Sequence, residues 1–186
     1  MNTHGLLIRC STDADRPTIA GIHADAFGPN QAQEIVELVD ALLDDPTARP
    51  LLSLVAEREG TLVGHVLFTS VVVGAEVRGR SARILAPLAV LSEHQRRGVG
   101  GTLIRTGLAL LAASDVGLVF VLGHPDYYCK YGFRPAGVLG FQAPYPIAPE
   151  NADAWMVLSL KEGLVGAISG VVQCAEALDH PRHWQE

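Results

Sequence analysis

HQRRGVGGTLI, residues 94–104, has an unusual composition for the start of a helix. Glycine is a poor helix former, costing about 1 kcal/mol relative to alanine, yet three stand here: Gly98, Gly100 and Gly101. Two arginines precede them: Arg96 and Arg97. The first N–H groups of a helix lack internal partners and lie at the positive end of its dipole, so they attract anions. Because glycine lets an anion approach the backbone closely, we expect a helix start that binds phosphate.

The hydrophobic patterns around this stretch predict both strands and helices. We expect strands at 6–10, 51–57, 61–77, 82–90, 117–123, 138–143 and 155–160. We expect helices at 13–27, from 30 to 44, from 98 to 113, and a short one at 125–131. Pro87 indicates an edge, a bulge or a splayed pairing in its strand, because proline cannot donate a ladder hydrogen bond. The order of the elements predicts a mixed α/β fold.

Length and composition limit the classes of protein that fit. The chain of 186 residues fits one domain, to which we assign residues 1–162, followed by a C-terminal tail, 163–186, with room for one more strand. The net charge of -6 argues against nucleic-acid binding. Three cysteines without paired or zinc-type spacing favour a reducing compartment. We find no signal peptide and no membrane-spanning apolar run, and we therefore expect a cytoplasmic protein.

The phosphate site does not match the common nucleotide-binding loops. It has no Gly-Lys-Ser/Thr of a P-loop, and no G-x-G-x-x-G follows the strand. Residues 95–100 read Q-x-x-G-x-G, which resembles the coenzyme A pyrophosphate loop of the GNAT N-acetyltransferase superfamily. A second motif follows in the order typical of that superfamily, because in YYCKYGFRPA Tyr128 lies four positions before Gly132 and Phe133. The longer segment LGHPDYYCKYGFRPA resembles a bacterial subgroup of predicted N-acetyltransferases.

The resemblance implies a fold, a co-substrate and roles for particular residues. The implied fold is a single-domain GNAT-like one, with a mixed sheet of about six to seven strands, splayed in the middle, and about four helices. The pantetheine arm of acetyl-CoA would contact backbone groups of Leu88, Ala89 and Val90. The pyrophosphate would be held by the glycine-rich stretch: Arg96, Arg97, Gly98, Val99, Gly100 and Gly101. Tyr128 would be the general acid that protonates the coenzyme A thiolate after direct attack by a primary amine, and no metal is implied.

The general base is not identified by the sequence. Residues 84–90 and 117–123, in the two central strands, include no ionisable side chain, whereas many members of the superfamily have a glutamate there. His124 and Asp126 lie nearest along the chain, and an imidazole has a suitable ordinary pKa of about 6.5. The alternatives are that water removes the proton or that the amine arrives neutral.

Other residues suggest chemistry but have a simpler structural interpretation. Cys129 lies five residues after His124, which suggests a thiol nucleophile, but we expect it to be a small buried filler. We expect Tyr127 and Tyr131 to pack in a small hydrophobic corner. His180 and His183 have no third ligand at metal spacing, and we expect a solvated tail around them.

Two rival functions and the acceptor stay open at this point. A non-catalytic acyl-CoA-binding sensor or scaffold would keep the fold but show no acceptor-dependent thiol release. A nucleotide-binding protein would use the same loop, although no acidic Mg²⁺ partner accompanies it. The acceptor is a small molecule or a protein amine. Four residues on early elements either bind a cationic acceptor or simply face water, and the sequence does not decide between the two: Glu34, Glu37, Glu57 and His65. The apolar late strands are compatible with a homodimer.

Overall fold

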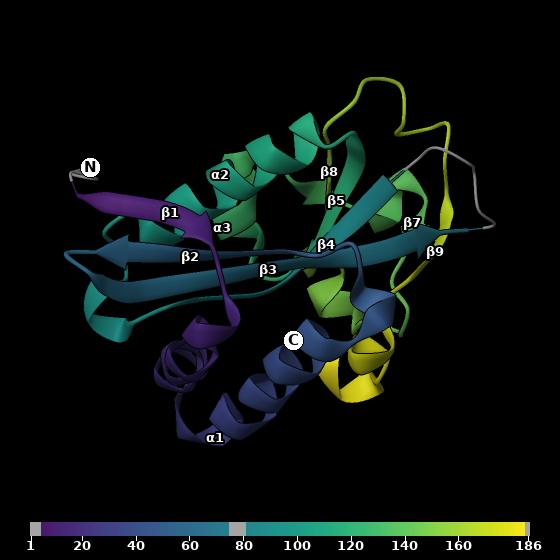
Figure 1. Cartoon of the computed structure of the whole chain (residues 1–186). Coiled ribbons are helices and arrows are strands. Elements are labelled where there is room, and N and C mark those ends of the chain that lie inside the picture. The colour runs from purple at the N-terminus through teal and green to yellow at the C-terminus, as the bar shows by residue number, and fades with distance from the viewer. Residues whose placement is uncertain (1–4, 75–80, 185–186) are drawn as a thin grey trace.

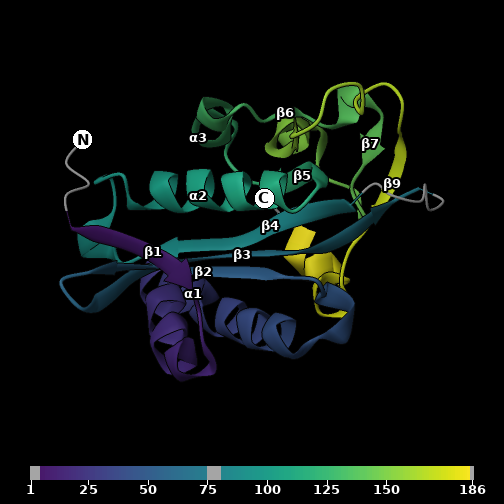
Figure 2. The ribbon, with the colours of Figure 1, turned by 45° about the horizontal axis from the view of Figure 1, so that its top comes forward.

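The computed structural model describes residues 5–74 and 81–184. A central sheet separates two layers of helices (Figures 1 and 2). α1 (Arg16–Asp44) covers one face, and the C-terminal turns lie on the same side. α2 (Val99–Ala113) and the short α3 (Pro125–Tyr128) lie on the other face. Among the described residues, no helix is long and apolar enough to cross a membrane.

The sheet is mixed, as the sequence predicts. Its strands are β1 (Leu6–Cys10), β2 (Leu52–Arg58), β3 (Thr61–Val73), β4 (Ser81–Val90), β5 (Val116–Leu122), β6 (Arg134–Pro135), β7 (Phe141–Gln142), β8 (Trp155–Ser159) and β9 (Gly170–Gln173). The main path runs β1-β2-β3-β4-β5-β8-β6, and β9 pairs with both β3 and β7. Along this path only β4 and β5 are parallel. The crossover through α2 explains this pair, because parallel neighbours need a long connection.

β4 and β5 separate before β4 ends. Their ladder stops where Leu85 lies opposite Val121, although β4 continues to Val90 and stays paired with β3 on its other side. Pro87, which follows a cis peptide bond, stands just past the last paired residue. Its missing N–H removes a ladder donor at that point. The predicted splay in the middle of the sheet is confirmed, and it leaves a gap between the two strands.

In the part of the chain that the structure describes, four α-helical segments flank the sheet, because α1 is interrupted once. Gly28 has a φ of 68° and a ψ of 176°, outside the helical range, and Pro29 follows it. α1 therefore consists of two helices joined at a kink, which agrees with the two helices that the sequence predicts here. α2 ends at Ala113 as expected, and α3 continues into a 3-10 turn at Cys129–Tyr131.

The prediction for the segment after α3 is partly wrong. The expected strand at 138–143 is instead a 3-10 turn at Gly137–Leu139, followed by the two-residue β7. A hydrogen bond of 3.1 Å from the Gly140 N–H to the Gly137 carbonyl closes that turn, so an extended strand cannot form there. β6 was not expected at all. For the expected strand at 61–77, β3 ends at Val73, and residues 75–77 lie outside the described residues.

The C-terminal tail is packed against the core in part, so the expectation of a solvated tail around His180 and His183 is only partly right. After β9 it forms two turns in which Leu178 and Trp184 are buried. Trp184 donates a hydrogen bond from Nε1 to the Leu178 carbonyl at 3.0 Å, and its ring centroid lies 5.6 Å from that of Trp155. His180 is exposed, but the side chain of His183 is only 2% exposed. The two apolar side chains hold the tail against the core.

Two histidines are buried between α1 and the sheet. His23 Nε2 lies 2.8 Å from His65 Nδ1, and His65 Nε2 lies 2.9 Å from Ser53 Oγ. Ser53 Oγ lies 2.5 Å from Ser11 Oγ, which extends the chain of hydrogen bonds. Burial lowers the pKa of His23 to about 4 and the pKa of His65 to about 3. Both rings are therefore neutral near pH 7, and His65 belongs to the core rather than to an acceptor site.

We expect the free energy of unfolding to fall as the pH is lowered from about 6.5 to about 5. Histidines in the unfolded chain take up protons in this window, whereas His23 and His65 stay neutral in the folded protein. The unfolded state then binds more protons, so the slope approaches about 1.4 kcal/mol per pH unit for each histidine. Denaturant titrations at several pH values measure this slope. The variant His65→Gln should give a shallower slope, and an unchanged slope contradicts this explanation.

Gly107 on α2 packs directly against the core. A Cβ built there would lie 2.6 Å from Phe68 Cζ and closer still to Cε2, and Phe68 is fully buried. We expect Gly107→Ala to lower the free energy of unfolding by about 1–3 kcal/mol, because overpacking outweighs the gain in helix propensity. Gly21→Ala is the control, since a Cβ at that helical position meets nothing within 4 Å. It should stabilise by about 0.5–1 kcal/mol in the same denaturant titration, and equal effects would contradict the packing argument.

Candidate active site

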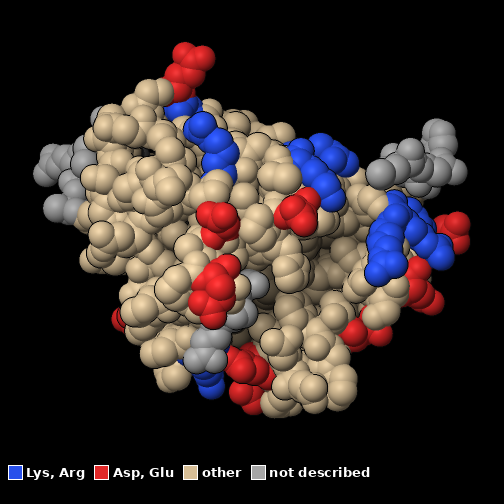
Figure 3. All heavy atoms as spheres, turned by 180° about the vertical axis from the view of Figure 1, so that it is seen from behind, with Lys and Arg blue, Asp and Glu red and all other residues tan. Residues whose placement is uncertain are grey.

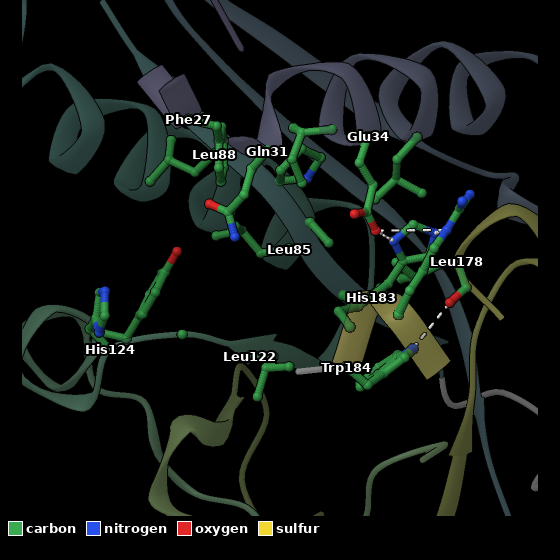
Figure 4. Close-up of a pocket in the computed structure, with 18 of the residues that line it drawn as sticks. Phe27, Gln31, Glu34, Leu85, Leu88, Leu122, His124, Leu178, His183 and Trp184 are labelled. Carbon is green, nitrogen blue, oxygen red and sulfur yellow. Dashed lines mark hydrogen bonds and ion pairs between the residues drawn. The ribbon is translucent and has the colours of Figure 1, made fainter. Parts of the chain in front are cut away.

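The gap between β4 and β5 opens into a cavity of about 430 Å³ (Figure 4). One part of its wall comes from α1 and the C-terminal turns, on one face of the sheet, and another comes from α3, on the opposite face. The apolar lining residues are Phe27, Ile35, Leu38, Ile84, Leu85, Ala86, Pro87, Leu88, Leu122, Leu178 and Trp184. The polar ones are Gln31, Glu34, His124, Tyr127, Tyr128, Arg182 and His183. The cavity thus reaches both faces where the sheet splits.

Tyr128 lies in the cavity wall and is only 8% exposed. Its ring is fixed by edge contacts with Tyr127 and Phe133, at centroid distances of 5.1 Å and 5.7 Å. Leu88 of β4 lines the same cavity. The structure therefore brings the tyrosine from the second sequence motif to the end of the splayed strand.

Tyr127 and Tyr131 lie over the first turn of α2. A Cβ built at Gly100 would be 2.6 Å from the Tyr127 hydroxyl, and one at Gly101 would be 2.6 Å from the Tyr131 hydroxyl. Burial and a hydrogen bond with Tyr131 raise the pKa of Tyr127. Both rings pack, as expected. These two glycines therefore have a role that the sequence did not reveal, which is to admit the tyrosine hydroxyls against the helix.

The backbone conformation of the loop before α2 brings neighbouring N–H groups close to one another. Arg96 has a φ of 58° and Gly98 a φ of 86°, so two left-handed residues flank Arg97. Successive N–H groups in such conformations form a concave anion site, next to the helix N–H groups that lack internal partners. Gln95 donates from Nε2 to the Val90 carbonyl at 3.0 Å, which ties this loop to the end of β4.

Both arginine side chains of the loop are exposed, and Val99, Gly100 and Gly101 of the helix start are buried. A Cβ at Gly100 would lie 3.6 Å from Val90 Cγ2 and 3.7 Å from Leu88 Cδ2, so the helix start packs on β4. In the view from behind, most of the visible Lys and Arg side chains lie in the upper half, near a hollow, whereas acidic ones are spread over the whole face (Figure 3). The residues from the first sequence motif are thus adjacent to the cavity without lining it.

The backbone of β4 presents alternate residues to the gap. Leu91 donates its N–H to the Val63 carbonyl on β3, at 3.0 Å. Because backbone groups alternate sides along a strand, those of Val90 and Leu88 point the other way, toward the gap. Ala89, which pairs with His65, directs its backbone groups to β3. Of the three expected contacts to the pantetheine arm, this geometry favours Leu88 and Val90 and speaks against Ala89.

Of the remaining candidates for a catalytic role, some line the cavity and others lie outside it. His124 lines the cavity at the start of α3 and is exposed, whereas Asp126 is exposed and is not among the lining residues. Cys129 is exposed as well, so the expectation of a buried filler is wrong. Its thiol points to the Asp126 carbonyl at 3.8 Å. Within residues 5–74 and 81–184, no group of three or more His, Cys, Asp or Glu side chains is placed to hold a metal ion.

The acceptor candidates on early elements also differ in whether they line the cavity. Glu34 lines the cavity, but Glu37 is exposed and accepts a hydrogen bond from Gln33 at 2.5 Å. Glu57 pairs with Arg9 at 3.3 Å on the β1–β2 ladder. Sequence reasoning missed the contribution of the C-terminal turns to the cavity wall. The only signal was a pair of apolar residues, Leu178 and Trp184, in the largely polar stretch 176–186.

Comparisons with known proteins give a consistent result. Residues 7–136 match the family model described as Acetyltransferase (GNAT) domain. The chain is 42% identical to the uncharacterized N-acetyltransferase YjhQ of Escherichia coli K12, over 95% of this chain and 96% of that protein. It resembles the structure of YhbS from Escherichia coli in complex with CoA (TM-score 0.81, 27% identity, 94% and 92% of the two chains). It also resembles a GNAT family acetyltransferase from Brucella melitensis in complex with acetyl-CoA (TM-score 0.74, 29% identity, 95% and 99%).

Proposed function

The chain belongs to the GNAT acetyltransferase family, and we propose that it transfers an acetyl group from acetyl-CoA to a primary amine at the split between β4 and β5. One observation carries this proposal. The cavity at the split is lined by both Leu88 and Tyr128 and lies beside the glycine-rich start of α2. Acetyl transfer needs a place for the thioester, a general acid and a pyrophosphate site, all within the length of one coenzyme A molecule. This arrangement offers places for all three.

The coenzyme would bind along β4 and the start of α2. The N–H groups at Val99, Gly100 and Gly101, with the exposed Arg96 and Arg97, are suited to the pyrophosphate. Backbone groups of Leu88 and Val90 would pair with the pantetheine amides, much as an added strand pairs with a sheet edge. The complexes of the two relatives with CoA and acetyl-CoA support this choice of ligand.

The chemistry would be a direct transfer. The amine nitrogen attacks the thioester carbonyl, a C–N bond forms and the C–S bond breaks. Backbone N–H groups of the splayed β4 would polarise the carbonyl oxygen as it gains charge. Tyr128 gives its proton to the departing thiolate. His124, exposed in the cavity wall next to α3, would receive the proton lost by the amine, directly or through water.

The test is acetyl-CoA-dependent thiol release in the presence of a panel of amines. We expect free coenzyme A to form only when both acetyl-CoA and an amine are present. The acetylated amine should appear in equal amount by mass spectrometry. Binding of acetyl-CoA with no thiol release for any amine would instead indicate the non-catalytic acyl-CoA-binding module.

A further inference from the structure

Besides the packing of Leu178 and Trp184, one carboxylate of α1 contacts the C-terminal turn at 181–184. Glu34 Oε1 lies 3.1 Å from His183 Nδ1 and 3.7 Å from Arg182 Nε, and Figure 4 shows Glu34 and His183 directed at each other. Arg182 donates from Nε to His183 Nε2 at 3.2 Å. The proton of a neutral His183 ring is therefore on Nδ1, facing Glu34. Burial lowers the pKa of His183, which favours that neutral form.

This attachment places apolar side chains across one end of the cavity. Leu178 and Trp184, both buried, line the cavity from the C-terminal turns. Phe27, Ile35 and Leu38 line it from α1. In the close-up, Leu178, His183 and Trp184 lie at the opposite end from His124 (Figure 4). The half of the cavity on the α1 side is thus an apolar chamber whose far wall depends on the C-terminal turn.

From this arrangement we propose that the α1 side of the cavity is the acceptor subsite, and that the acceptor is a primary amine carried on an apolar stem. In this subsite the C-terminal turn is a wall and Glu34 is a positioning residue that holds the turn through His183. The inference rests on the proposed function, because the coenzyme would occupy the α2 side of the split and leave the α1 side to the acceptor.

The lining explains why the stem should be apolar. A stem with ether or hydroxyl oxygens would lose water contacts against Phe27, Ile35 and Trp184 without gaining matched partners. A hydrocarbon stem gains from leaving water there. Glu34 and Arg182 are partly exposed, with side-chain exposures of 40% and 52%, and Gln31 is exposed, so these three polar groups lie at the rim. The fourth polar residue on this side, His183, is buried, but its ring nitrogens face Glu34 and Arg182.

Two amines with the same number of non-hydrogen atoms test the stem directly. Hexylamine and 2-(2-aminoethoxy)ethanol would be titrated calorimetrically into the protein loaded with coenzyme A, a state that cannot turn over. We expect hexylamine to bind at least about tenfold more tightly, since a methylene replaces the ether oxygen and a methyl group replaces the hydroxyl. Equal affinities, no binding of either amine, or tighter binding of a lysine-containing peptide overturns the inference. Failure of coenzyme A itself to bind contradicts the proposed function instead.

The role of Glu34 is tested by variants on the same helix. Glu34→Ala should weaken hexylamine binding and raise its KM about tenfold, with the KM for acetyl-CoA unchanged, because only the acceptor wall loosens. Glu34→Gln keeps an oxygen in the place of Oε1, which lies 3.1 Å from His183 Nδ1, and should stay near wild type. Glu37→Ala, at an exposed position one turn away, is the matched control. Hexylamine binding by Glu34→Ala that equals that of Glu37→Ala overturns the positioning role, as does an equal rise in both KM values.

Discussion

Replacing Tyr128 with phenylalanine is expected to lower kcat by about 10²- to 10³-fold while the KM for acetyl-CoA changes little. The ring would keep its contacts with Tyr127 and Phe133, so the cavity wall stays in place. What is lost is the proton for the thiolate, which forms only as the C–S bond breaks. An interaction used only in the transition state affects kcat rather than binding. Steady-state thiol release, measured with a saturating amine, gives both constants.

Tyr127→Phe is the matched comparison, because Tyr127 is adjacent, lines the same cavity and also carries a hydroxyl. Its hydroxyl lies over Gly100 and its pKa is raised by burial and by Tyr131. We expect its removal to change kcat by less than about tenfold, since it acts in packing. If the two variants lose activity in the opposite order, the acid is Tyr127 and the assignment from the Gly-Phe spacing is wrong.

A negative charge at Gly98 should weaken acetyl-CoA binding by about 100-fold or more. Gly98 has a φ of 86° and stands where the loop meets α2, beside the N–H groups proposed to hold the pyrophosphate. An aspartate there places like charges together, and charge-assisted hydrogen bonds of this kind contribute about 1.5–3 kcal/mol each. Arg97→Glu should act in the same direction. Calorimetric titration of each variant with acetyl-CoA measures the change.

Gly98→Asn separates charge from shape. Asparagine is nearly the same size as aspartate and also adopts left-handed backbone conformations, so it imposes a similar strain without the charge. We expect it to bind acetyl-CoA several-fold more tightly than Gly98→Asp does. Equal losses in the two variants would mean that the loop needs glycine for its conformation and that no phosphate lies beside it.

The sequence was sufficient to predict the helices and most strands of the sheet, because these depend on local patterns, but β6 was not expected and the strand expected at 138–143 is largely a turn. The kink in α1 falls between two helices that were predicted separately. Pro87 indicated an edge, a bulge or a splayed pairing, and the structure shows that β4 leaves β5 there. The two motifs also predicted which residues would gather near the split. Local patterns carry this information because periodicity and proline act over a few residues.

Other features of the site depend on contacts between distant parts of the chain. The contribution of His183 and Trp184 to the cavity could not be predicted, because it requires the tail to return to α1 after β9. The position of the Tyr127 hydroxyl over Gly100 depends on how α3 docks on α2. Alternation along β4 distinguishes Leu88 from Ala89 only once the pairing with β3 is known. The register of the strands and the docking of the helices and the tail are therefore the features that could not be predicted from the sequence.

The central claim is that the chain binds acetyl-CoA at the split and at the start of α2. Calorimetric titration of the wild-type protein with acetyl-CoA tests it most directly, with ATP as the comparison ligand. We predict a single site with a dissociation constant of about 1–100 μM, in the range of ordinary substrate affinities, and no comparable binding of ATP. Absence of acetyl-CoA binding up to millimolar concentration, or tighter binding of ATP, would contradict the account.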